Sequence, residues 1–255
     1  MIKKLEICDL SYRYPEEDHS ALQDITLDVT NDNIVAILGN NGSGKTTLLL
    51  LVLKKYLPHA GAIHFLNENN ATENEIRIGY LPQIEKTPYG FTVIEYVMMG
   101  RYPHVGWLNL PDERDREISQ KVIRELQVEK LSKKHLSDLS GGELQKVRIA
   151  RLLAQEPDIL LMDEPANHLD LKNRRELLSI IHNLKDKNKI ILFTTHDPND
   201  AVEIANQVLL MKDGSVVAFG QTNTVMRQDN LQKTFDIPIN LQQINKKIVV
   251  IPGEQ

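Results

Sequence analysis

Several features that would assign this sequence to other classes of protein are scarce or missing. Cys8 is the only cysteine, so the chain has no internal disulfide framework and suits a reducing compartment. The longest strongly apolar run, Leu48–Leu53, is far shorter than the roughly 20 residues that a membrane-spanning helix needs. No long apolar segment follows the lysines near the start, so we expect no signal peptide for export.

An excess of basic residues is also missing. The chain carries 30 Lys and Arg against 35 Asp and Glu, a formal net charge of -5. This charge argues against a protein that binds nucleic acid by bulk electrostatic attraction, and we predict no nucleic-acid partner. The 255 residues, 41% hydrophobic and 25% charged, fit one globular domain with room for an inserted subdomain. Because the sequence has no apolar run long enough to cross a membrane, any membrane role must come through a partner.

The hydrophobic pattern predicts an α/β protein. Residues 25–29 alternate with period two, which favours an antiparallel strand with one solvated face. Ile34–Leu38, Ile159–Met162 and Ile190–Phe193 are continuous apolar runs, typical of parallel strands buried on both faces. Helical patterns separate these runs, so the strands are expected to form a parallel sheet. Ligands of such sheets gather at the carboxyl ends of the strands, and polar residues follow each run there.

Two other regions differ from this alternation. Between about residues 85 and 154 the strand signal vanishes, and residues 112–127 carry apolar side chains at helical spacing, which predicts an inserted group of helices. Residues 207–219, with an Asp-Gly turn at 213–214, predict a closing hairpin. From about residue 235 the pattern does not decide between helix and strand.

A glycine-rich loop follows the first buried strand. Its residues are Gly39, Asn40, Asn41, Gly42, Ser43, Gly44, Lys45, Thr46 and Thr47, and they match G-x-x-x-x-G-K-[ST] between a strand and an apolar helix. The glycines let backbone N–H groups converge on phosphate oxygens, while Lys45 reaches the outer phosphates and the Thr46 hydroxyl reaches Mg²⁺. A glycine turn that merely starts a helix would not need this spacing, so we predict a phosphate-binding loop.

Two adjacent carboxylates, Asp163 and Glu164, end the second buried strand. On an extended chain their side chains point in opposite directions, so we expect them to have different roles. Asp163 suits a Mg²⁺ partner and Glu164 suits a group that polarises an attacking water. A solvated Asp-Glu-Pro turn is the ordinary alternative, and only the company of Lys45 argues against it.

The segment Leu139–Glu143 reads Leu-Ser-Gly-Gly-Glu. Ser140 and Glu143 have capping-box spacing, so an ordinary helix start accounts for part of it. Two glycines directly after the cap are costly in a helix unless another backbone or a phosphate approaches closely. Together with residues 145–151 and 160–165, the segment resembles the signature of ABC ATPases. Glutamine is the commonest family residue at position 143, and because the capping box accepts either residue we expect the helix start to survive.

Four further residues resemble elements of the same family, in order along the chain. Tyr14 resembles the aromatic that stacks on adenine, Gln83 the Q-loop glutamine, Asp170 the D-loop aspartate and His196 the switch histidine. His196 also follows a buried strand at the expected catalytic edge, where an imidazole can contact the γ-phosphate. Tyr12 is a rival for the stacking role, because Tyr12 and Tyr14 would share one face of a strand. We favour Tyr14 from its motif position.

The resemblance covers most of the chain and implies a P-loop NTPase (RecA-like) α/β core with an antiparallel β subdomain and an inserted helical subdomain. The chain is then one ABC ATPase domain: residues 1–84 and 155–234 form the nucleotide-binding core, residues 85–154 the helical subdomain and residues 235–255 a C-terminal extension. ATP and Mg²⁺ are the implied cofactors. Thr46, Gln83 and Asp163 are the implied metal partners, and Glu164, His196 and Gln83 the catalytic residues.

The resemblance also implies a homodimer. Two nucleotide-binding domains face head to tail, so that Ser140, Gly141 and Gly142 of one copy cap the ATP on the phosphate loop of the other. In transporters of this family the dimer sits at the cytoplasmic face of the cell membrane. It docks there peripherally on integral permease subunits, and through them acts with a substrate-binding protein.

Residues 100–104, Gly-Arg-Tyr-Pro-His, and 196–199, His-Asp-Pro-Asn, are similar to importers of ferric siderophores, haem, cobalamin and molybdate. A plain loop ending a helix is the alternative reading of the first segment. We therefore predict an ATPase that energises import of a metal chelate, a ferric siderophore by preference. The main alternative is a soluble ABC ATPase of iron–sulphur cluster assembly. A scaffold that binds nucleotide without hydrolysis is disfavoured, because Glu164 and His196 are both present.

Overall fold

The structure is a computed structural model and describes residues 2–69, 71–73, 75–105, 109–185, 188–244 and 247–253. Residues 245, 246, 254 and 255 of the predicted C-terminal extension lie outside the described residues, as do residues 1, 70, 74, 106–108, 186 and 187 of the other predicted parts. Among the helices described, none is long and apolar enough to cross a membrane.

A six-stranded sheet forms the centre of the molecule, in the order β5-β6-β7-β3-β8-β9. Its strands are β3 (Asn33–Leu38), β5 (Ile78–Leu81), β6 (Ile159–Met162), β7 (Ile190–Thr195), β8 (Gln207–Lys212) and β9 (Ser215–Gln221). The first five are parallel and contain the three apolar runs predicted to be buried, while β9 pairs antiparallel with β8. The predicted closing hairpin is thus confirmed, with positive φ angles at Asp213 and Gly214 in its turn.

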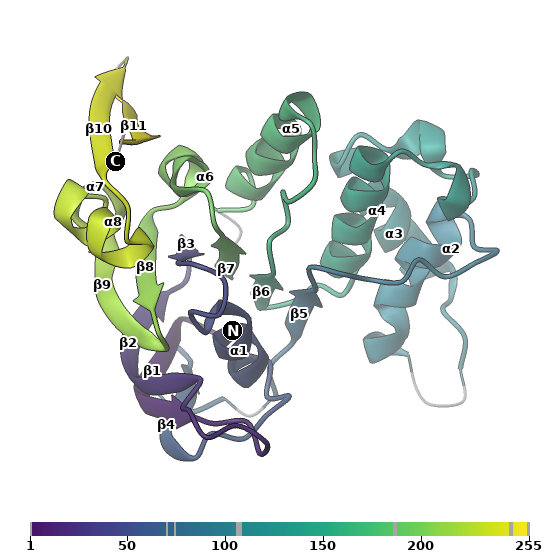
Figure 1. Cartoon of the computed structure of the whole chain (residues 1–255). Coiled ribbons are helices and arrows are strands. Elements are labelled where there is room, and N and C mark those ends of the chain that lie inside the picture. Colours follow the sequence, from purple (N-terminus) through teal and green to yellow (C-terminus); the bar gives the residue numbers. More distant parts are fainter. Residues whose placement is uncertain are drawn as a thin grey trace.

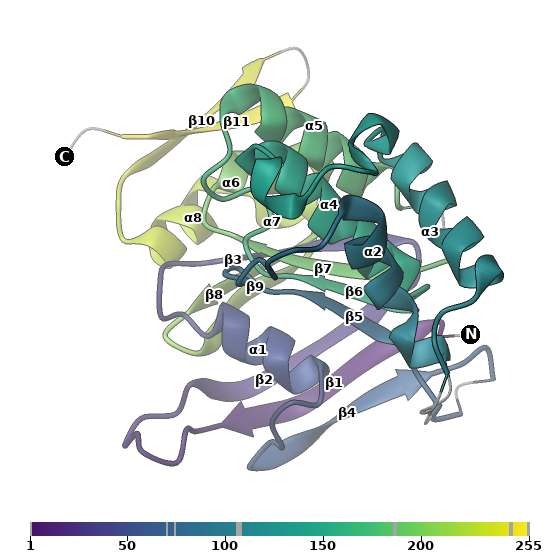
Figure 2. The ribbon, with the colours of Figure 1, turned by 90° about the vertical axis from the view of Figure 1, so that its right-hand side faces the viewer.

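A second, antiparallel sheet covers one face of the first. It has the order β2-β1-β4, with β1 spanning Lys4–Tyr12, β2 Leu22–Thr30 and β4 Ala60–Leu66. Helix α1 (Lys45–Val52) lies between the two sheets (Figure 2). Leu48, Leu49 and Leu51 of this helix pack in one core with Val35 and Ile37 of β3 and with the buried residues of β1 and β2. This packing explains why almost every residue of α1 is buried.

The predicted helical insert lies between β5 and β6 and forms a group beside the sheets (Figure 1). Its elements are α2 (Val93–Met98), the short 3-10 helices η1 (Met99–His104), η2 (Glu129–Leu131) and η3 (Leu136–Asp138), α3 (Glu113–Glu125) and α4 (Gly141–Ala154). Asp112 caps α3 by accepting a hydrogen bond from the backbone of Asp115. Val122, Ile123 and Leu126 are buried, as their helical spacing predicted.

The other face of the large sheet is covered by helices α4, α5 (Leu171–His182) and α6 (Pro198–Ile204), with α7 (Thr222–Val225) and α8 (Gln228–Phe235) beside them (Figure 2). Ile34, Ala36 and Leu38 of β3 point into this second core, while Val35 and Ile37 point into the first. The period-two alternation of a strand therefore divides one apolar run between two cores.

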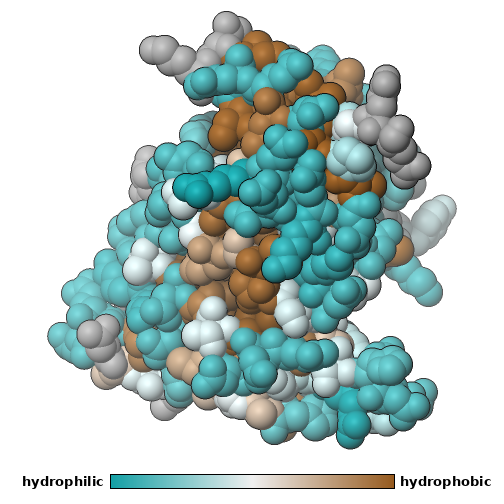
Figure 3. All heavy atoms as spheres, turned by 60° about the vertical axis from the view of Figure 1, so that its left-hand side comes forward, coloured by the Kyte–Doolittle hydropathy of each residue, from teal (hydrophilic) through white to brown (hydrophobic). Residues whose placement is uncertain are grey.

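The last described residues form a hairpin of β10 (Ile239–Ile244) and β11 (Lys247–Pro252). The hairpin is joined to α6 by a paired amide contact: the Asn199 side chain donates to Val250 O at 3.1 Å and accepts from Val250 N at 2.9 Å. Ile239 and Val250 are buried against the core. On this side of the molecule an apolar band runs between hydrophilic flanks toward the hairpin (Figure 3).

Candidate active site

The phosphate loop connects β3 to α1 at the carboxyl edge of the large sheet. Gly44, the residue before α1, has φ 97°, and a Cβ there would lie 2.6 Å from Leu22 and 2.7 Å from the carbonyl of Ala21. Glycine is therefore required for both conformation and space. As in any α-helix, the first backbone N–H groups of α1 have no intrahelical partner, and the N-cap residue Gly44 has no side chain that could accept from them.

Lys45 and Ser43 lie inside this loop. Lys45 is only 6% exposed, and its ammonium donates to the carbonyls of Gly39 and Asn40 at 2.8 and 2.9 Å. Burial lowers the pKa of Lys45, against the opposing attraction of Glu164 and Asp163. Among the described residues, the buried Ser43 hydroxyl has no hydrogen-bond partner. A buried cation, an unpartnered hydroxyl and open helix amides are the chemistry that a phosphate chain fits.

A cavity of about 550 Å³ runs along the outside of the loop. Tyr14, Lys45, Thr46, Gln83 and Glu164 are among the residues that line it. The cavity joins the predicted adenine-stacking residue to the predicted catalytic carboxylate, as a nucleotide site requires.

The two candidate aromatics differ in access to this cavity. Tyr12 ends β1, is 6% exposed and stacks on Tyr56 with ring centroids 5.5 Å apart. Tyr14 lies beyond the end of the strand, so the expectation that the two share a strand face is wrong. The Tyr14 hydroxyl is hydrogen-bonded to the Thr47 hydroxyl at 3.0 Å, beside the loop. The geometry therefore favours Tyr14 over Tyr12 for stacking on a base.

Asp163 is buried at the end of β6 and is held from two sides. Thr46 of the loop donates to its Oδ2 at 2.8 Å, and Thr194 of β7 donates to its Oδ1 at 2.6 Å. Burial, and then the charge of Asp163, raise the pKa of Tyr80 to about 12, so this neighbouring phenol keeps its proton. The contact between Thr46 and Asp163 brings together two of the three predicted metal partners.

The described residues contain no group of three or more His, Cys, Asp or Glu side chains that could hold a metal ion. At the end of β6, Thr46 and Asp163 offer one hydroxyl and one carboxylate. That suits Mg²⁺, which is commonly bound by one or two protein groups together with substrate phosphates and water. The Thr46 hydroxyl and the Asp163 carboxylate fit this mode of coordination.

The sequence predicted that Glu164 continues the extended strand, but it does not. Its φ of 44° is left-handed, so the chain turns at this residue. Thr194 Oγ1 accepts from the Glu164 backbone N–H at 2.8 Å, and Asp163 and Glu164 have different side-chain partners. A strained backbone angle held by the surrounding structure is common at functional sites.

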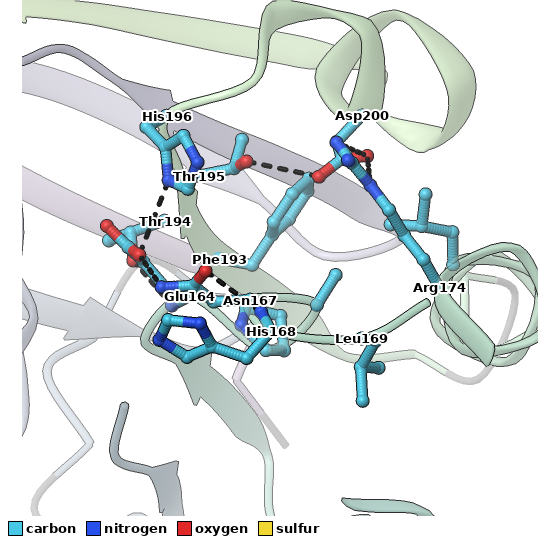
Figure 4. A pocket seen from close by; sticks show the side chains of 13 residues that line it. Glu164, Asn167, His168, Leu169, Arg174, Phe193, Thr194, Thr195, His196 and Asp200 are labelled. Carbon is cyan, nitrogen blue, oxygen red and sulfur yellow. Dashed lines mark hydrogen bonds and ion pairs between the residues drawn. The ribbon is translucent and has the colours of Figure 1, made fainter. Parts of the chain in front are cut away.

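Three polar side chains converge on the Glu164 carboxylate, two of them predicted from the sequence and the third its chain neighbour Asn167. Its Oε2 accepts from Gln83 Nε2 at 3.1 Å. It also accepts from Asn167 Nδ2 at 2.8 Å, and His196 Nδ1 lies 3.4 Å away (Figure 4). Glu164 is only 9% exposed, whereas the His196 imidazole is 56% exposed. The structure thus brings Gln83, Glu164 and His196 together, with the imidazole open to an incoming ligand.

Ser140, Gly141 and Gly142 are placed elsewhere, at the start of α4, and none of them lines the cavity along the loop. The predicted capping box is confirmed: Ser140 accepts from the backbone N–H of Glu143, and the Glu143 carboxylate accepts from Ser140 N and Oγ at 2.8 Å. These hydrogen bonds from Ser140 lower the pKa of Glu143. Glu143 therefore completes the capping box in the way that glutamine would at this position.

Asp170 caps α5 and likewise lies away from the loop cavity. Its carboxylate accepts from the backbone and side chain of Asn173 at 2.8 and 2.9 Å. A side chain at Gly142 would meet the Asn173 carboxamide at 2.4 Å. Asp170 and the glycine segment after Ser140 are therefore close to one another within one chain, but not close to its own phosphate loop.

Sequence reasoning missed three residues that hold the site. Thr194 bridges Asp163 and the backbone of Glu164, Asn167 binds the Glu164 carboxylate, and Arg174 forms ion pairs with Asp197 and Asp200. Threonine is common in strands and arginine in helices, so nothing in the sequence marked Thr194 or Arg174. Only Asn167, three residues after Glu164, is close enough in the sequence to suggest a contact with that carboxylate.

The fold and site define a P-loop NTPase, with a phosphate loop and a carboxylate pair at the carboxyl edge of a parallel sheet. The sequence model of the ABC transporter family matches residues 22–167, more than half of the chain. The chain therefore belongs to the ABC transporter family. It is an ATP-binding subunit of the kind that hydrolyses ATP to power transport.

Similar proteins agree with this assignment along the whole chain. The molybdate import ATP-binding protein MolC of Haemophilus influenzae is 34% identical over 248 residues, 97% of this chain and 94% of that protein. A Helicobacter pylori protein described as an iron chelatin transport ATP-binding protein is 33% identical over 253 residues, 96% and 98% of the two chains. A solved inward-facing ABC transporter, described as of metal-chelate type, contains a chain with TM-score 0.89 and 32% identity, covering 100% of this chain and 98% of that one.

Proposed function

We propose that this chain is the ATP-hydrolysing subunit of an importer of metal chelates, with ferric siderophores as the solute class. The convergence of Gln83, Glu164 and His196 beside the phosphate loop carries the hydrolytic part of this proposal. The import part is supported by the relatives described for molybdate and iron chelates and by the neighbour of metal-chelate type. The Gly-Arg-Tyr-Pro-His segment at 100–104 points to the same class.

The chemistry follows from where each group lies. Lys45, the Ser43 hydroxyl and the first amides of α1 bind the phosphates. Glu164 takes a proton from the attacking water, and Gln83 and Asn167 keep its carboxylate in place. His196 is open to the terminal phosphate and to the water. Thr46, Asp163 and Gln83 would hold Mg²⁺, which when bound neutralises charge on the phosphate oxygens.

The proposal includes a head-to-tail homodimer. Ser140–Gly142 and Asp170 lie together at the starts of α4 and α5, away from the loop cavity of their own chain. A second copy facing the first would bring this segment over the ATP of the other, and the N-terminal end of α4, with its positive dipole end, suits a phosphate there. One ATP would then be enclosed by two chains, and its hydrolysis would release them.

The composite site can be tested by mixing two inactive variants. Ser140→Ala should impair hydrolysis at the partner's loop, and Lys45→Ala should disable its own loop. In a mixture, each heterodimer then has at most one working site, formed by the intact loop of one chain and the intact Ser140 of the other. ATPase assays of the separate and mixed variants measure this. Full wild-type activity in the mixture would reject the head-to-tail arrangement.

The transporter assignment of this chain is tested by its partner. We expect the protein, purified in mild detergent from membranes of its own cell, to bring with it a polytopic permease, and the dimer to lie at the cytoplasmic face of the membrane. The permease would carry the solute pocket and receive solute from a substrate-binding protein, so its transport of ferric siderophores tests the solute class. Recovery with soluble iron–sulphur assembly proteins and no permease would instead favour the soluble alternative, which the described relatives do not favour.

A further inference from the structure

Arg174 lies one turn into α5, four residues after the predicted D-loop residue Asp170. Its Nε donates to Asp200 Oδ1 at 2.8 Å, and its terminal nitrogen contacts Asp200 at 2.7 Å (Figure 4). The same terminal nitrogen also pairs with Asp197. One guanidinium therefore binds two carboxylates at the start of a different helix: Asp197 is the N-cap of α6, and Asp200 lies in its first turn. A planar, forked donor suits such paired binding.

Both carboxylates follow His196 closely in the chain. We call residues 195–200 the switch turn. Asp197 follows His196 directly and caps α6 by accepting from Asn199 N at 2.8 Å. Asp200 accepts from the hydroxyl of Thr195, the residue before His196, at 3.2 Å, and that hydroxyl accepts from Asp197 N at 3.1 Å. Both chain neighbours of the histidine are thus fixed through groups that Arg174 holds.

Because Asp200 is buried, its negative charge needs the compensating charge of Arg174. Asp200 is 5% exposed, and burial raises its pKa although Arg174 opposes that effect. Arg174 itself is partly buried, and hydrogen bonds to Asp197 and Asp200 raise its pKa against the effect of burial. Removing one partner of a buried ion pair leaves the other charge without compensation, so the switch turn would have to rearrange.

The same helix turn faces the segment that is proposed to cap the partner's ATP. Asn173, next to Arg174, packs on Gly142 and is bound by the helix cap Asp170. The first turn of α5 therefore touches the glycine segment of α4 through Asn173 and the switch turn through Arg174. A single rigid element joins the surface that meets a second copy to the residue that faces this chain's own nucleotide.

We propose that Arg174 is a positioning residue for His196: it fixes the switch turn so that the imidazole stays beside Glu164, and it links that turn to the glycine segment through α5. This rests on the proposed function, in which His196 acts in hydrolysis. Arg174 itself touches no substrate. Its removal changes how often the histidine is in place, and leaves the phosphate loop unchanged.

The test compares Arg174→Gln with Arg175→Ala, a change of the exposed next residue on the same helix. Arg174→Gln should lower the turnover number about 10- to 100-fold, as a misplaced catalytic group does, with ATP affinity unchanged. Arg174→Lys should restore part of the activity, because it keeps the charge. In the nucleotide-free protein the imidazole NMR signal of His196 should shift in Arg174→Gln and not in Arg175→Ala.

A double-mutant cycle with His196→Ala separates positioning from general damage. If Arg174 acts through His196, then adding Arg174→Gln to His196→Ala should cost less than about 2-fold further. Losses that multiply, or an unchanged His196 signal, would overturn the inference. If His196→Ala alone has no effect, the proposed role of His196 fails instead, so the two failures are distinguishable.

A second variant keeps the test valid should Arg174→Gln fail to fold. Asp197→Asn removes one ion pair but retains a residue that caps helices well, and Arg174 keeps its grip on Asp200. We expect a smaller loss of turnover that also disappears in the His196→Ala background. Full additivity of this variant with His196→Ala would overturn the inference.

Discussion

Replacing Glu164 by glutamine is expected to lower ATP turnover by about 10²–10⁴-fold, the range for losing a positioned general base, while nucleotide still binds. Glutamine keeps the shape of the side chain and one oxygen that can accept from Gln83 and Asn167, but it loses the charge that takes up a proton. The phosphate-binding groups around Lys45 are untouched. Steady-state ATPase assays and nucleotide titrations of the same preparation measure both effects.

The matched control is Glu117→Gln, the same change at an exposed position of α3 far along the chain from the site. It should leave turnover within about 2-fold of the wild type, as surface substitutions usually do. If Glu164→Gln hydrolyses ATP as fast as this control, Glu164 is not the group that activates water.

Replacing Lys45 by alanine should act on binding itself. We expect the affinity for ATP to fall about 10- to 100-fold, since hydrogen bonds to charged groups each contribute about 1.5–3 kcal/mol. The change also leaves the carbonyls of Gly39 and Asn40 without the donor that holds the loop closed. Titration calorimetry with ATP or with a hydrolysis-resistant analogue would measure the affinity without interference from turnover.

Lys133→Ala, at an exposed position in the helical insert, is the control for the loss of one positive charge. A long-range charge effect would weaken ATP binding in both variants, and would do so less at high salt. Equal ATP affinity in Lys45→Ala and the wild type would contradict the assignment of the phosphate loop. The two predictions are independent, because one concerns turnover with binding kept and the other concerns binding.

Much of the fold could be read from local pattern. Ile34–Leu38 and Ile190–Phe193 are continuous apolar runs because both faces of their strands are buried, so composition alone marked them as parallel strands. The turn at Asp213 and Gly214 was marked by residues that tolerate positive φ. The C-terminal hairpin was not predicted. Its stability depends on Asn199 and the core beneath it, which lie elsewhere in the sequence.

The candidate site divides in the same way. The phosphate loop and the cap at Ser140 are contiguous motifs, so their spacing could be recognised directly. The left-handed turn at Glu164 could not be foreseen, since the neighbouring residues gave no reason to leave an extended conformation. The choice between Tyr12 and Tyr14 was likewise decided by where β1 ends and which ring is buried.

The sequence by itself determined the phosphate loop, the carboxylate pair and the alternation of strands and helices, because each is encoded within a few adjacent residues. Only the tertiary structure decided which distant residues meet. Thr46 binds Asp163 across 117 positions, Thr194 joins Asp163 to Glu164, and Arg174 grips the turn that carries His196. Such contacts follow from the packing of strands and helices that are far apart in the chain, and local periodicity carries no record of them.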